Sequence, residues 1–315
     1  MSKTIVVALG GNAILQSNQR GTAHEQQQNL AQALRNLIPF IRRGDRLAIT
    51  HGNGPQVGNL LMQQDAGAKA YDIPPLPLDV CVAETQGSIG YMITCTLRNL
   101  LLSEDADRQV VPLVTEIIVD KQDPAFQNPT KRVGRLYDRE MADRLTAEKG
   151  WTFKPSPKKQ GAWRRVVPSP RPVEIPSAGI VRRLLNQNTI VVTAGGGGVP
   201  VYRDDSGICH GVEAVIDKDA ASALLASAIG ADELYILTDV PAVYLNFGKP
   251  EQEVIEQLTP AEARAFISRG AFGEGNMLPK IQAAVSFVSN GGHKAIITNF
   301  ARLNQPGAGT QIVNP

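Results

Sequence analysis

Short apolar runs alternate with longer segments of helical periodicity along most of the chain. The short runs lie at residues 4–9, 46–50, 109–119, 189–193, 233–238 and 294–298. Runs of this kind are typical of strands in a parallel sheet whose two faces are both covered. Apolar residues three or four positions apart predict helices at residues 25–43, 80–102, 178–188, 217–229, 260–269 and 279–290. Strands alternating with helices predict an α/β protein, a three-layer α/β/α sandwich with a mainly parallel open sheet.

The alternation stops between residues 120 and 175. This segment holds many prolines and several basic residues, and it has no clean periodicity. Structureless segments of such length are uncommon inside a compact domain, so we expect an inserted subdomain that protrudes from the body, with a small hairpin at 164–167. The basic residues between 154 and 171 are expected to form a solvated loop surface. The chain is otherwise predicted to be a single domain, 1–315, with an N-terminal lobe 1–190 and a C-terminal lobe 191–315.

Composition narrows the functional classes. The 315 residues are 43% hydrophobic, and the net charge is only +2 without a long basic run, which argues against a nucleic-acid partner. The most apolar segment, 80–102, contains Glu84 and Arg98 and predicts a buried helix rather than a membrane span. The apolar start is too short for a secretory signal, and three sparse cysteines fit reduced thiols, so a cytoplasmic protein is expected. The cysteines and four histidines show no metal-ligand spacing, so no dedicated metal site is predicted.

Three glycine-rich turns each follow a predicted strand. They are Gly10-Gly11-Asn12, Gly52-Asn53-Gly54 and Gly195-Gly196-Gly197-Gly198. The carboxyl ends of parallel strands share one edge of the sheet, where ligands bind, and glycine lets backbone N–H groups approach an anion. Any one of these turns could contain glycine only because a tight turn from strand to helix requires it. Together they predict a site for several phosphates or for two neighbouring anions.

Familiar catalytic signatures do not occur. The sequence lacks the P-loop pattern, the protein-kinase catalytic motifs, the Gly-x-Gly-x-x-Gly dinucleotide turn and the Gly-x-Ser-x-Gly nucleophile turn. A phosphoryl-transfer site must therefore be built from other groups.

Two lysines stand at predicted helix starts. Lys218 lies between Asp217 and Asp219, and Lys280 follows Pro279. A lysine there opposes the helix dipole, which suits phosphate binding better than stability. Phosphoryl transfer needs such positive charge around the moving group. Asp219 could orient both ammonium groups, although the two aspartates could instead cap the helix and the lysines could be solvated.

The motifs resemble those of carbamate kinases, in the amino acid kinase family. The similarity runs in order from residue 5 to about residue 313. The glycine turns and Asp217-Lys218-Asp219 are shared with the wider family. Two more specific segments lie in the insertion, Asn128-Pro129-Thr130-Lys131 and Arg164-Arg165-Val166-Val167-Pro168-Ser169-Pro170.

The resemblance implies a homodimer that catalyses ATP + carbamate = ADP + carbamoyl phosphate with Mg²⁺, operating toward ATP synthesis in arginine and carbamoyl phosphate catabolism. It implies catalytic roles for Lys131, Lys218, Asp219 and Lys280. The N-terminal lobe would bind the small anion through Gly10, Gly11, Asn12, Gly52, Asn53 and Gly54. The C-terminal lobe would bind ATP or ADP through Gly195, Gly196, Gly197, Gly198, Asp239, Tyr244 and Met277.

Three positions depart from the family pattern. Arg132 follows Lys131 where proline is usual, Gln160-Gly161-Ala162 precedes Trp163, and Asn276 precedes Met277. They leave two alternatives open: phosphorylation of another small carboxylate, and a nucleotide-binding module without catalysis.

Overall fold

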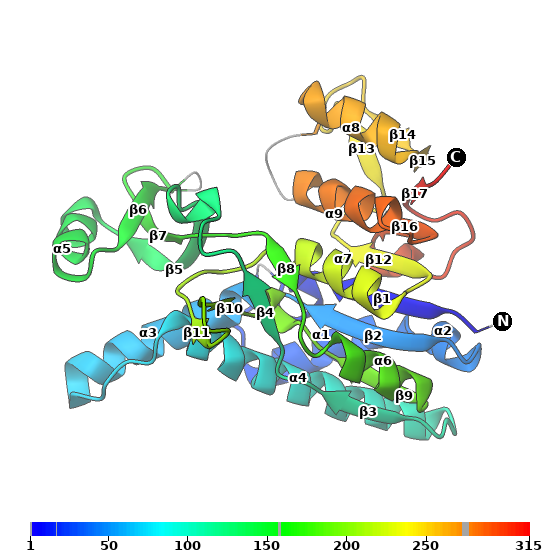
Figure 1. Cartoon of the computed structure of the whole chain (residues 1–315), viewed down its shortest axis with the longest axis horizontal. Helices are drawn as coiled ribbons and strands as arrows, with labels where there is room; N and C mark the ends of the chain where they lie inside the picture. The colour runs from blue at the N-terminus through cyan, green and yellow to red at the C-terminus, as the bar shows by residue number, and fades with distance from the viewer. Residues whose placement is uncertain (1, 17, 157–158, 273–276) are drawn as a thin grey trace.

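A computed structural model describes residues 2–16, 18–156, 159–272 and 277–315, and its main sheet is mostly parallel (Figure 1). Neighbouring strands run parallel from β16 to β3, whereas β17 is antiparallel to β16. In spatial order the strands are β15 (Gln257–Leu258), β17 (Thr310–Val313), β16 (Lys294–Thr298), β12 (Glu233–Leu237), β1 (Thr4–Leu9), β2 (Arg46–His51), β9 (Thr189–Val192) and β3 (Gln109–Pro112).

Helices cover both faces of this sheet, which confirms the predicted fold class. One core lies under α1 (Ala23–Arg35), α2 (Ile38–Arg42) and α4 (Leu78–Ser103). The other lies under α6 (Ala178–Asn186), α7 (Lys218–Ile229), α8 (Pro260–Ser268) and α9 (Met277–Ser289). Strand β1 is buried along its whole length and feeds both cores, Ile5 and Val7 on one face and Val6 on the other. This double burial explains its unbroken apolar run.

The helix predicted at 25–43 is wrong as a single element. It is divided into α1 and α2, with a turn at Asn36 and Leu37. Pro39 explains the break, because a proline ring clashes with the carbonyl four residues earlier, here that of Arg35. Helix α2 ends as expected at Gly44, whose φ of 76° is readily adopted by glycine.

The strand predicted at 109–119 is also two elements. Its first part, β3, is an edge strand of the main sheet that ends at Pro112, which has no N–H to donate. Its second part, β4 (Glu116–Val119), belongs to another sheet, of order β11 (Cys209–Gly211), β10 (Val199–Arg203), β4 and β8 (Pro172–Glu174). The Thr115 hydroxyl bonds to Leu113 O at 3.0 Å and to the Thr193 hydroxyl at 2.6 Å, which fixes the turn between them.

The inserted segment forms its own small sheet. Strand β7 (Trp163–Val167) is central, flanked antiparallel by β5 (Lys131–Tyr137) and β6 (Thr152–Pro155), with α5 (Arg139–Lys149) beside them. The hairpin predicted at 164–167 is wrong, because these residues form the single strand β7, paired on both sides. We refer to the three strands as the protruding sheet. Figure 1 shows this sheet standing away from the main sheet, near α3 (Gly54–Tyr71). The division into lobes 1–190 and 191–315 stays a prediction.

A hairpin and four short 3₁₀ turns complete the described part of the body. Strands β13 (Val243–Leu245) and β14 (Glu253–Ile255) form a hairpin, and single turns of 3₁₀ helix lie at η1 (Gly11–Ala13), η2 (Pro124–Phe126), η3 (Gly195–Gly197) and η4 (Phe300–Arg302). No helix within the described ranges combines the length and apolarity needed to span a bilayer.

Candidate active site

The three glycine turns lie at the carboxyl ends of adjacent strands. They follow β1, β2 and β9, which are neighbours in the main sheet and run parallel. The first two turns face one another: a methyl group placed on Gly52 would be 3.8 Å from Gly11 N and 3.5 Å from Lys218 Cδ. The first two glycine turns and the stem of Lys218 are therefore neighbours, an arrangement that suits an anion.

Lys218, Asp219 and Lys280 converge beside these turns. Asp219 accepts a hydrogen bond from Lys218 on one carboxylate oxygen and from Lys280 Nζ on the other, the latter at 2.8 Å. The lysines come from the first turns of α7 and α9, and Lys280 is 61 residues from Asp219 in the sequence. The predicted role of Asp219 in orienting two ammonium groups fits this geometry. The group carries two positive charges and one negative, so it keeps a net positive charge for an incoming phosphate.

Burial makes this group electrostatically strong. The side chains of Lys218 and Lys280 are 15% and 8% exposed, and that of Asp219 is 5% exposed. Burial alone would raise the pKa of Asp219, but the two ammonium groups lower it to about 2, so its carboxylate stays ionised. Burial and the charge of Lys218 lower the pKa of Lys280, and the carboxylate of Asp219 opposes that change.

Lys131 reaches the same place from the protruding sheet. Its Nζ donates to Asp217 Oδ2 at 3.0 Å. Asp217 also caps α7, since its Oδ1 accepts from Asp219 N at 2.9 Å and from Ala220 N at 3.4 Å. Capping, one of the alternatives for the two aspartates, is thus the role of Asp217. Lys131 is 39% exposed, so a substrate can compete for its ammonium group.

The third glycine turn packs against the second one. A methyl group on Gly195 would meet His51 Nε2 at 2.3 Å, and one on Gly196 would meet Asn53 Nδ2, also at 2.3 Å. Gly197 and Gly198 are blocked likewise, by Ile216 O at 2.2 Å and by Ile117 Cγ1 at 2.4 Å. These glycines let the backbone pass beside the turn that carries Asn53, whose amide also donates to Thr85 Oγ1 at 2.8 Å.

The residues predicted to bind nucleotide are therefore divided in space. Asp239 is exposed just after β12, Tyr244 is half-buried in β13, and Met277 is half-buried at the start of α9. Strand β9 is three positions from β12 in the sheet, or about 14 Å at the usual strand spacing. Gly195–198 thus lie beside the second glycine turn, and their nucleotide contact stays a prediction.

Sequence reasoning assigned no role to His51, yet it lies in the site. Its Nδ1 is 3.0 Å from Gly52 O, and its side chain is buried. Burial, aided by the positive charge of Lys218, lowers the pKa of His51 to about 4. The imidazole is therefore neutral at neutral pH and supports the glycine turns without adding charge.

Two of the three departures lie in the inserted segment 120–175. Arg132 in β5 is opposite Val166, and residues 160–162 precede β7, with Gly161 at φ 74°. Neither displaces Lys131 from Asp217. Asn276 lies outside the described residues.

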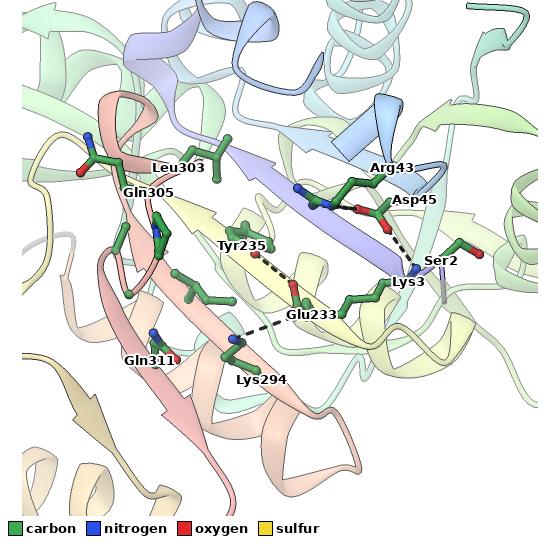
Figure 2. A pocket seen from close by; sticks show the side chains of 14 residues that line it. Ser2, Lys3, Arg43, Asp45, Glu233, Tyr235, Lys294, Leu303, Gln305 and Gln311 are labelled. Atoms are coloured by element: carbon green, nitrogen blue, oxygen red, sulfur yellow. Dashed lines mark hydrogen bonds and ion pairs between the residues drawn. The ribbon is translucent and has the colours of Figure 1, made fainter. Parts of the chain in front are cut away.

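A hollow of about 600 Å³ lies at the opposite, amino edge of the same strands (Figure 2). Glu233 there accepts hydrogen bonds from Lys3 Nζ at 2.6 Å and from Tyr235 Oη at 2.9 Å, and Lys294 Nζ is 4.0 Å away. Asp45 is similarly paired with Arg43 at 2.8 Å. None of the predicted site residues lines this hollow.

Comparisons with known proteins agree with this geometry. The family model described as "Amino acid kinase family" matches residues 3–299. The carbamate kinase of Thermococcus kodakarensis is 46% identical over 315 residues, covering 99% of each chain, and carbamate kinase 1 of Enterococcus faecium is 45% identical over 99% of this chain and 98% of its own. The solved structure of carbamate kinase from Giardia lamblia bound to AMP-PNP superposes with a TM-score of 0.92 at 38% identity, covering 100% of this chain and 99% of the other. The chain therefore belongs to the amino acid kinase family, in its carbamate kinase branch.

Proposed function

We propose that this protein catalyses reversible phosphoryl transfer between ATP and carbamate, giving ADP and carbamoyl phosphate. The observation that carries the proposal is the convergence of Lys218 and Lys280 on one buried carboxylate beside two glycine turns. The full-length similarity to carbamate kinases supports carbamate as the acceptor. On the same basis, ATP synthesis from carbamoyl phosphate, within arginine catabolism, is the proposed direction.

The chemistry needs positive charge and alignment more than it needs a base. Carbamate is already an anionic nucleophile, so its main obstacle is repulsion by the phosphate groups. Lys218 and Lys280 would neutralise the oxygens of the moving phosphoryl group, and Asp219 holds both lysines in place. The N–H groups of the first two turns would bind the small anion between them.

Lys131 would complete the small-substrate side. Its ammonium group bonds to Asp217 at 3.0 Å. A carbamoyl phosphate molecule held by the glycine turns would offer phosphate oxygens to the same ammonium group. We therefore propose that Lys131 exchanges Asp217 for the substrate phosphate.

The nucleotide would lie on the C-terminal side of the reacting group, near Asp239, Tyr244 and Met277. Tyr244 packs on Phe247 with ring centroids 5.8 Å apart, and Phe247 is 65% exposed, which leaves aromatic surface for a base. Mg²⁺ in such enzymes is held largely by substrate phosphates and few carboxylates. The described residues contain no cluster of three His, Cys, Asp or Glu side chains that could hold a metal. Asp217, 28% exposed, is the site carboxylate best placed to reach an ion that arrives with the nucleotide, whose charge would offset that of the phosphates.

We also propose a cytoplasmic homodimer that joins through α4. Val80, Tyr91 and Leu102 are 38%, 61% and 84% exposed, and their spacing of eleven residues places them along one stripe of this helix. An exposed apolar stripe beside the edge strand β3 fits a second copy. The cysteines Cys81, Cys95 and Cys209 form no disulfide with one another.

A substrate panel tests the proposed function. Purified protein supplied with ADP and Mg²⁺ should form ATP from carbamoyl phosphate, and in reverse should prefer carbamate to acetate, aspartate and glutamate as acceptor. If the protein prefers another carboxylate, that carboxylate replaces carbamate as the proposed acceptor. Absence of transfer with every acceptor would leave a nucleotide-binding protein and overturn the proposal.

A further inference from the structure

Arg165 in the protruding sheet is buried, although the sequence predicted a solvated surface there. It is 5% exposed, and its Nη2 donates to Glu213 Oε2 at 2.8 Å. Its guanidinium also lies 3.9 Å from the ring centroid of Trp151. Burying an arginine is unfavourable unless its charge is paired, so the ion pair with Glu213 holds the Arg165 side chain in one place.

The two partners belong to the two segments that meet in the site. Arg165 lies on β7, and Glu213 lies on the segment that leads into α7 and ends at Asp217. A backbone hydrogen bond from Val215 N to Pro168 O, of 3.0 Å, joins the same two segments. The ion pair is therefore a bond between the protruding sheet and the entrance to the catalytic helix.

Lys131 is placed by the same strands. In the pairing of β5 with β7, Lys131 is opposite Val167 and Val133 is opposite Arg165. Arg165 is thus two residues along β7 from the partner of Lys131. Both side chains cross from the protruding sheet to the segment 213–217, Arg165 to Glu213 and Lys131 to Asp217. A shift of the Arg165–Glu213 contact would therefore also shift the Lys131–Asp217 contact.

We infer that Arg165 is a positioning residue, which sets the distance of Lys131 from the reacting phosphate through its ion pair with Glu213. This inference rests on the proposed carbamate kinase function. Arg165 contacts Glu213 and Trp151 and acts on the substrate only through Lys131. Its loss should therefore weaken use of carbamoyl phosphate and leave nucleotide binding intact.

Two variants test the inference, Arg165→Met and Glu213→Gln, each keeping the approximate shape of the side chain it replaces. We expect kcat/KM for carbamoyl phosphate to fall at least tenfold while KM for ADP changes less than twofold. In the Lys131→Ala background, either change should add less than twofold, because its effect passes through Lys131. The matched control is Arg203→Met, which removes an exposed Arg–Glu pair of 2.6 Å between β10 and β8 and should leave both constants unchanged.

Thermal unfolding of each variant separates positioning from folding. If Arg165→Met is unfolded, Glu213→Gln carries the test, since it removes the charge and keeps the side-chain volume. If the parent protein is active, three results would overturn this inference and leave the proposed function standing. The two variants could keep full kcat/KM for carbamoyl phosphate, or could lose ADP affinity as strongly as they lose kcat/KM. They could also add their full effect to that of Lys131→Ala. A parent protein that forms no ATP from carbamoyl phosphate would overturn the proposed function, and this inference with it.

Discussion

Both edges of the main sheet hold a carboxylate between two lysines, and only one edge is built for chemistry. At the carboxyl edge, Asp219 lies between Lys218 and Lys280, whose side chains are 15% and 8% exposed. The glycine turns leave a small space beside these lysines, where a methyl group on Gly52 would meet only ordinary contacts. The ammonium groups of Lys218 and Lys280 are thus buried and fixed, and they lie next to the glycine turns.

At the amino edge, Glu233 lies between Lys3 and Lys294, whose side chains are 52% and 33% exposed. Tyr235 donates its hydroxyl to the second oxygen of Glu233 (Figure 2). Water screens the charges of these two lysines, whose ion pairs with Glu233 hold the starts of neighbouring strands together. Both carboxylates are buried, so the two edges differ in the burial of their lysines and in the glycine turns beside them. We propose that these two differences make a phosphoryl site of a Lys–carboxylate–Lys arrangement.

The largest expected difference between the edges follows removal of the shared carboxylate. Asp219→Asn should lower kcat by about a thousandfold, because two buried ammonium groups lose their common partner and their fixed positions. The measurement is the steady-state rate of ATP formation, with thermal unfolding to confirm that the protein is folded.

The matched control at the other edge is Glu233→Gln, which should keep kcat within twofold. A similar loss of kcat in both variants would show that the two clusters do not differ as described. The comparison would then fail.

The next effect concerns pH and His51 at the carboxyl edge. Its folded pKa of about 4 lies below the ordinary 6.5, so between these values the unfolded chain binds more protons than the folded one. Stability should be complete above pH 6.5 and fall by about 3 kcal/mol as pH drops to 4, at 1.36 kcal/mol per pKa unit. Urea unfolding across this range measures the slope, and His51→Gln should remove most of it. An unchanged pH dependence of the free energy of unfolding in His51→Gln would show that another group causes it.

The smallest of the three effects concerns Lys131, the most exposed lysine of the site. Lys131→Ala should lower kcat/KM for carbamoyl phosphate by about a hundredfold, because one charge-assisted contact to the phosphate is lost. ADP binding, measured by calorimetry, should change less than twofold. Equal losses for both substrates would refute the assignment of Lys131 to the small-substrate side.

Most of the fold could be predicted from periodicity, and the failures have identifiable causes. Pro39 divides a helix whose apolar spacing continues across it. Helix α3 was not predicted, because only Val57 and Gly58 along it are buried and no apolar stripe marks it. Strand β4 was merged with β3, because the hydrogen bond between Thr115 and Thr193, which helps to fix the turn between them, joins residues 78 positions apart.

The site was predictable in part for a similar reason. Lysines at helix starts and glycines after strands are local signals, and they indicated Lys218, Lys280 and the first two turns. The pairing of Lys131 with Asp217 joins residues 86 positions apart, and that of Arg165 with Glu213 spans 48. No local pattern reveals such contacts. The run of four glycines suggested a phosphate loop, whereas its tight packing against His51 and Asn53 requires glycine for steric reasons.

The central claim is that Lys218 and Lys280 bind the phosphoryl group that moves. The most direct measurement is a crystal structure of the protein with Mg²⁺ and a non-hydrolysable ATP analogue. We expect both ammonium groups within about 3 Å of oxygens of the terminal phosphate, as charge-assisted hydrogen bonds require. A terminal phosphate held elsewhere, with both lysines still bonded only to Asp219, would contradict the account.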